Sequence, residues 1–165
     1  IIKWINRILS WEPNARIVLH GVSMGAATVL MASGEDLPGN VKAVIADCGY
    51  TSEWDEFQRE ADALHIPWFP VLNATSVLSK IRDGYDFKQA SALAQVKKSR
   101  IPTLFIHGSS DELVPYSMLG ELYAAAACEK EELTVEGAGH ALSSSVAPTL
   151  YWRTVEDFIA KYLDR

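Results

Sequence analysis

The Gly-Val-Ser-Met-Gly motif at residues 21–25 restricts the fold of this chain more than any other feature, because of its neighbours. Before it, the β-branched apolar run 16–20 predicts a buried strand. After it, the small and apolar residues 26–32 predict a helix that ends at Gly34. A strand that turns directly into a helix strains the middle residue and crowds the neighbouring segments, and the two glycines of the motif add no bulk there. The motif therefore predicts a sharp turn with Ser23 at its tip, at the positive end of a helix.

Predicted strands alternate with predicted helices along the whole chain. This alternation favours an α/β fold, a parallel sheet with flanking helices built from right-handed β-α-β units. We expect strands at 16–20, 41–46, 101–107 and 132–136. We expect helices at about 1–10, 26–33, 52–64, 71–82, 88–98, 116–128 and 148–163. A length of 165 residues suits a single domain over 1–165, and the long segment at about 51–100 is expected to include a small cap.

Several apolar side chains have expected positions in this scheme. Trp54, Phe57, Trp68 and Phe69 would form either an apolar cover over a site or, as helical spacing more often means, part of the core. In the last helix the residues expected to face inward are Leu150, Val155, Phe158, Ile159 and Tyr162.

Composition excludes several classes of function. A net charge of −6, with no basic run interleaved with aromatic residues, argues against nucleic acid or an anionic membrane as the main partner. No apolar stretch approaches the roughly 18 residues that span a bilayer. Cys48 and Cys128 are expected to be buried thiols rather than a disulfide framework. No metal-ligand spacing is visible among Cys and His, and we expect neither a metal nor a cofactor.

Three residues with catalytic chemistry follow three of the predicted strands. Ser23 follows the first, Asp111 lies in the loop after the third, and His140 follows the fourth. The active sites of open parallel sheets lie beyond the carboxyl ends of the strands, so we expect these three residues at the same edge of the sheet. Taken alone, Asp111 could be a helix cap or surface ion pair and His140 an ordinary loop histidine. Their joint occurrence, in the order Ser, Asp, His, favours a catalytic triad.

Each residue type has a role that this chemistry requires. A serine hydroxyl attacks only if a base removes its proton, and imidazole can take that proton and return it to the leaving group. A buried carboxylate orients the imidazole and stabilises its charged form. His20 and His107 end predicted strands just before glycine, and we interpret both as packed structural histidines.

The chain resembles the carboxyl-terminal half of an α/β-hydrolase. The matching motifs are the elbow at 21–25, the acid loop at 107–115 and Gly139-His140. The segment 47–52 is similar to that of bacterial cell-surface hydrolases allied to the serine aminopeptidase and prolyl oligopeptidase-like groups. The resemblance implies Ser23 as nucleophile, Asp111 as acid and His140 as base, with the backbone amide of Met24 as one oxyanion donor.

The resemblance also implies that this sequence supplies about four of the usual eight strands. A second oxyanion donor would come from a loop that we do not find in the sequence, and losing one donor typically costs on the order of 10²–10³ in turnover. The first strand would be an exposed apolar edge, open to self-association. Because the chain begins at Ile1 within a helical pattern, we expect material upstream, where any signal or anchor would lie. Localisation therefore stays open between the cytoplasm and the surface of a bacterial cell.

The sequence predicts a serine hydrolase that cleaves a carboxylic ester, or less readily an amide or peptide, through an acyl-enzyme. The alternative is a non-catalytic α/β-hydrolase-like binding module or an inactive fragment of a hydrolase. Acyl transfer to an alcohol would use the same triad. The partner expected is a small ester or amide substrate.

Overall fold

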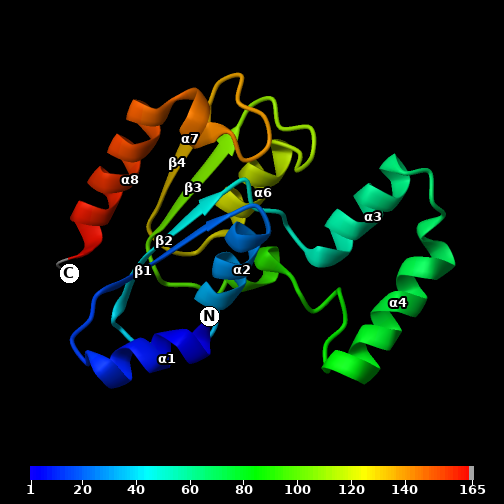
Figure 1. The fold of residues 1–165 in the computed structure, drawn as a ribbon, viewed down its shortest axis with the longest axis horizontal. Coiled ribbons are helices and arrows are strands. Elements are labelled where there is room, and N and C mark those ends of the chain that lie inside the picture. Colours follow the sequence, from blue (N-terminus) through cyan, green and yellow to red (C-terminus); the bar gives the residue numbers. More distant parts are fainter. Residues whose placement is uncertain (164–165) are drawn as a thin grey trace.

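The computed structural model describes residues 1–163 and contains a four-stranded parallel sheet in the order β1-β2-β3-β4 (Figure 1). The strands are β1 Ile17–Val22, β2 Val41–Asp47, β3 Thr103–Gly108 and β4 Lys130–Val135. Because each strand pairs with the next one in sequence, every connection is a crossover that carries helices. The predicted α/β class is confirmed, as is the partial α/β-hydrolase sheet.

Helices occupy the segments between the strands. They are α1 Ile2–Trp11, α2 Met24–Ser33, α3 Glu53–Ala63, α4 Trp68–Asp83, α5 Ala92–Val96, α6 Ser117–Ala125, α7 Ser143–Val146 and α8 Pro148–Leu163. The last helix begins at Pro148, as the sequence predicts, and continues to Leu163, the last residue that the structure describes. The helix expected at 88–98 is shorter, because Ser91 caps α5 by accepting from the Ala94 amide at 3.1 Å. The short α7 was not predicted.

The sheet separates two hydrophobic cores. On one face, α1, α2, α5 and α6 pack on side chains such as Leu19, Val44 and Phe105. On the other face, α8 packs on Ile45, Leu104 and their neighbours. The central strands β2 and β3 are therefore covered on both sides, which explains their nearly continuous apolar sequences.

The inward face of α8 differs from the prediction at one position. Leu150 is 50% exposed, whereas the neighbouring Tyr151 is buried. The buried residues Tyr151, Val155, Phe158 and Tyr162 are spaced by four, three and four, which keeps them on one stripe of the helix. Leu150 lies off that stripe.

Helices α3 and α4 stand away from the sheet as a hairpin (Figure 1). Ser52 caps α3 by accepting from the Asp55 amide at 3.0 Å, at the start of the helix that the sequence predicts over 52–64. A cavity of about 290 Å³ lies between the two helices, with Phe57 and Trp68 in its apolar lining. Phe69 is exposed, and the Trp54 ring lies 4.3 Å from Lys88 Nζ. That this hairpin acts as a cap stays a prediction.

Within residues 1–163, no helix is both long enough and apolar enough to cross a membrane.

Candidate active site

Ser23 lies at the tip of the turn between β1 and α2. Its backbone has φ 55° and ψ −118°, a region that non-glycine residues rarely occupy. The Ser23 amide donates to the Asp47 carbonyl at 2.8 Å, and the Ser23 carbonyl accepts from the Ala27 amide at 3.0 Å. The turn is therefore held from the sheet on one side and from the helix on the other.

The two glycines of the motif contribute differently to this turn. A Cβ on Gly21 would lie 2.2 Å from the Gly25 carbonyl oxygen, so any side chain at position 21 would collide with backbone. A Cβ on Gly25 would meet no atom within 4 Å. The prediction that both positions exclude bulk is thus wrong for Gly25, whose backbone is the surface that Gly21 approaches.

Asp111 lies in the loop after β3, and its carboxylate is fully enclosed. Its Oδ1 atom accepts from the amides of Leu113 and Val114, at 3.0 and 2.9 Å. Its Oδ2 atom lies 2.8 Å from His140 Nδ1 and 3.3 Å from His107 Nε2. These donors lie in β3, in the loop after it and in the loop after β4, and together they compensate the burial of the carboxylate and determine which oxygen faces His140.

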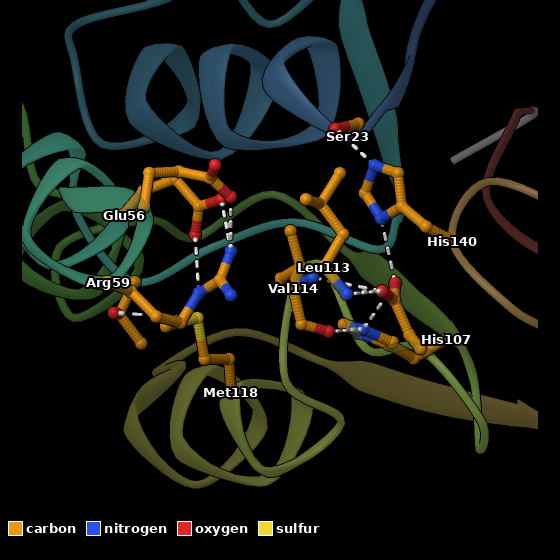
Figure 2. A network of polar contacts seen from close by, with 11 residues as sticks. Ser23, Glu56, Arg59, His107, Leu113, Val114, Met118 and His140 are labelled. Carbon is orange, nitrogen blue, oxygen red and sulfur yellow. Dashed lines mark hydrogen bonds and ion pairs between the residues drawn. The ribbon is translucent and has the colours of Figure 1, made fainter. Parts of the chain in front are cut away.

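His140 contacts Ser23 on one side, as Figure 2 shows, and Asp111 on the other. Its Nδ1 lies 2.8 Å from Asp111 Oδ2 and its Nε2 lies 2.8 Å from Ser23 Oγ. A carboxylate can only accept, so Nδ1 carries the proton in the neutral ring and Nε2 is the acceptor for the serine hydroxyl. The structure therefore brings together all three side chains that the sequence selected.

Met24 is the first residue of α2, and its side chain is 70% exposed. The amides of the first turn of a helix have no intrahelical acceptor. The Met24 amide lies next to Ser23 at the start of α2, and its role as an oxyanion donor stays a prediction.

His107 has a closer relation to the site than the sequence suggested. It is buried as predicted, but its Nε2 lies 3.0 Å from the Val114 carbonyl as well as 3.3 Å from the Asp111 carboxylate. The carbonyl requires a donor, so Nε2 carries the proton and shares it between the two oxygens. The signal in the sequence was its position four residues before Asp111, at the end of the strand that leads into the Asp111 loop.

Cys48, Asp111 and His140 place one ligand-type atom each within 4.8 Å of one another, so these described residues form a candidate metal cluster. Burial, followed by the charge of Asp47, raises the pKa of the Cys48 thiol to about 12. Metals bind the thiolate, which this environment disfavours. Both His140 nitrogens already have hydrogen-bond partners. The donor set therefore fits a hydrogen-bonded triad better than a metal centre.

Helix α3 approaches this region with charged side chains. Arg59 contacts the carboxylates of Glu56 and Glu60 at 2.8 and 2.9 Å. In the view of Figure 2, the Glu56–Arg59 pair lies on the opposite side of Leu113 from Ser23 and His140.

A parallel sheet with this strand order, and with Ser, Asp and His side chains at three strand ends, defines an α/β-hydrolase fold. The model of the prolyl oligopeptidase family matches residues 5–165, nearly the whole chain. The chain belongs to the prolyl oligopeptidase family.

Curated relatives match this chain in sequence, and solved structures match it in fold. The chain is 31% identical over 161 residues to the uncharacterized protein YqkD of Bacillus subtilis, covering 94% of the chain and 53% of YqkD. Among solved structures, it matches the Pyrococcus horikoshii acylaminoacyl peptidase with a TM-score of 0.72, at 18% identity, over 96% of the chain and 26% of that protein. An acetyl xylan esterase from Paenibacillus sp. R4 matches with a TM-score of 0.70, at 19% identity, over 98% of the chain and 51% of that protein. The chain spans about half the length of the curated relatives that it matches.

Proposed function

We propose that this chain carries the catalytic site of a serine hydrolase that cleaves a carboxylic ester, and less readily an amide, through an acyl-enzyme. Ser23 is the nucleophile, His140 the general base and Asp111 the residue that orients His140. The observation that carries the proposal is the unbroken chain of two 2.8 Å contacts from Asp111 through His140 to Ser23. Geometry of this kind is the first requirement for a general base.

The reaction follows from the protonation states of the triad. His140 Nε2 takes the Ser23 proton while Oγ bonds to the substrate carbonyl carbon. Collapse of the tetrahedral intermediate breaks the bond to the leaving group, which receives the proton from Nε2. Water then attacks the acyl-enzyme with the same assistance and releases the acid, restoring Ser23.

The Met24 amide is the oxyanion donor that this chain offers. Because this amide lies at the start of α2, the positive end of the helix dipole would stabilise the oxyanion in addition to the hydrogen bond. The strained backbone of Ser23 supports the role of this residue as the nucleophile, because it turns the Ser23 side chain out of the strand and towards His140.

The choice between ester and amide is a separate part of the proposal. The matched structures include an acylaminoacyl peptidase and an acetyl xylan esterase, so the fold accommodates both reactions. A set of p-nitrophenyl esters and aminoacyl p-nitroanilides with matched acyl groups would decide between them. We expect faster turnover of the esters.

The principal test is labelling of the purified protein with a fluorophosphonate, which reacts with activated serines. We expect one label per chain, on Ser23, and none in Ser23→Ala. Asp111→Asn should reduce ester turnover by about 10⁴-fold, because the amide favours the wrong histidine tautomer. The matched control is Ser145→Ala, an exposed serine of α7, which should label as the wild type does.

Persistent labelling of Ser23→Ala would overturn the assignment of the nucleophile. A wild-type protein that left both the probe and every ester untouched would favour a non-catalytic binding module.

A further inference from the structure

A second buried carboxylate lies next to the triad, and the proposed reaction does not use it. Asp47 is the last residue of β2 and is only 1% exposed. A carboxylate buried to this degree is costly unless it is well hydrogen-bonded. The partners of Asp47 therefore indicate why the residue is there.

The backbone of Asp47 supports the nucleophile. Its carbonyl accepts from the Ser23 amide at 2.8 Å, one residue beyond the end of β1. This bond continues the β1–β2 ladder into the turn, where Ser23 has its unfavourable backbone angles. Movement of the end of β2 would therefore move Ser23.

The side chain of Asp47 supports the loop that carries the base. Its Oδ1 accepts from Ser143 Oγ at 3.1 Å, and Ser143 is fully buried three residues after His140. Between these two residues the chain makes a tight turn, with Ala141 at φ 57° and the Leu142 amide donating to the Gly139 carbonyl at 3.1 Å. The Ser143 contact fixes the far end of this turn.

The hydrogen bonds around Asp47 extend to the helix α8 and to the strand β1. The Tyr151 hydroxyl of α8 hydrogen-bonds to Asp47 and lies 3.0 Å from His20 Nε2 on β1. Because a carboxylate only accepts, Ser143 and Tyr151 both donate to Asp47, and Tyr151 then accepts from His20. One carboxylate thus links β1, β2, α7 and α8 around the site.

We propose that Asp47 is a positioning residue, which holds Ser23 through its carbonyl and the His140 loop through its carboxylate. It keeps Ser23 Oγ and His140 Nε2 at hydrogen-bonding distance without touching the substrate. This inference rests on the proposed function. Its physical basis is that nucleophile and base come from segments 117 residues apart, so only tertiary contacts can set their separation.

The test removes the Asp47 side-chain contact while leaving the triad intact. Ser143→Ala deletes one hydroxyl, and we expect kcat for an ester to fall about 10- to 100-fold with KM unchanged, since small misplacements have effects of this size. Fluorophosphonate labelling should slow by the same factor. Asp47→Ala should behave like Ser143→Ala, whereas Asp47→Asn, which keeps an acceptor for Ser143, should recover most of the activity.

The matched control is Ser33→Ala. Ser33 is also buried and donates to the Leu30 carbonyl at 2.8 Å, but at the far end of α2. Ser33→Ala should lower the free energy of unfolding by about as much as Ser143→Ala does, but it should keep the wild-type kcat. Equal kcat in Ser143→Ala and Ser33→Ala, at temperatures where both are folded, would overturn the positioning role.

A crystal structure of Ser143→Ala separates this inference from the proposed function. We expect the Ser23 Oγ to His140 Nε2 separation to exceed hydrogen-bonding distance, and an unchanged 2.8 Å would overturn the inference even if the enzyme is active. Absence of Ser23-dependent activity in the wild type would instead overturn the proposed function.

Discussion

At the scale of single residues, Ser23 shows that the site stores backbone strain. A non-glycine residue at φ 55° and ψ −118° costs of order 1–3 kcal/mol and persists only if its surroundings hold it there. The bonds to Asp47 and Ala27, and the close approach of Gly21 to Gly25, supply that support. The strain is what presents Oγ to His140 rather than to the sheet.

Asp47 leads to a prediction about the pH dependence of stability. Burial raises the pKa of its carboxyl above the ordinary value, against the opposing hydrogen bonds of Ser143 and Tyr151 and the charges of His107 and His20. A carboxyl whose pKa is higher in the folded state than in the unfolded state stabilises the fold while it is protonated. This contribution is fully present below the pKa of the unfolded state, and it is lost as pH rises through the pKa of the folded state. The free energy of unfolding of the wild type should therefore fall relative to Asp47→Asn as pH rises from about 4, and then level off.

Chemical denaturation of both proteins across this pH range measures the difference. Asp86→Asn is a control of opposite sign, because the hydrogen bond from Lys80 lowers the pKa of exposed Asp86. A difference between wild type and Asp47→Asn that stays constant with pH would refute the prediction.

At the scale of elements, the α3–α4 hairpin differs from the helices that cover the sheet. No residue of α3 is buried, and its Phe57 ring lies 4.8 Å from the ring of Phe87, in the segment after α4. A helix with so little tertiary burial depends on its caps more than a core helix does.

The cap of α3 gives a prediction for this element. Ser52→Ala removes the acceptor for the Asp55 amide and should destabilise α3 by about 1 kcal/mol. Amide hydrogen exchange in α3 should accelerate roughly five-fold. Ser91→Ala removes the equivalent cap of α5 and should accelerate exchange there instead. The same exchange pattern in both variants would show that these caps do not act locally.

At the scale of the whole molecule, the outer edge of β1 pairs with no strand among residues 1–163. The amides of Ile17 and Ser23 point towards β2, and direction alternates along a strand. The amides of Val18, His20 and Val22 therefore point outward. Unpaired edges of this kind are templates for association, and we propose that residues 1–165 by themselves pair through this edge.

Substitution at Val18 tests the edge. Val18→Pro removes an outward amide without breaking a bond to β2, and it should lower the average mass measured by light scattering. Val18→Ala loses a similar amount of side-chain packing but keeps the amide, so it should associate as the wild type does. Equal masses for the two variants would exclude pairing through this edge.

Much of this fold could be read from local patterns. Alternating strands and helices predicted the sheet, and the starts of the helices expected at 52–64 and 148–163 were found because their signals lie within a few residues. The same rule predicted Ser23, Asp111 and His140, since each lies in the turn or loop after a strand and parallel strands end at one edge. Their catalytic roles stay a prediction.

Tertiary structure alone decided which other residues support that site. Asp47 and Ser143 are 96 residues apart, and neither has a neighbour in sequence that indicates their contact. His107 was interpreted as packing because its bond to Asp111 depends on how the loop folds back. Periodicity and turn chemistry report interactions over a few residues, so they fix the elements and strand ends of this chain. The pairing of polar groups in its interior depends on which strand ends and loops come to lie together, and only the folded chain determines that.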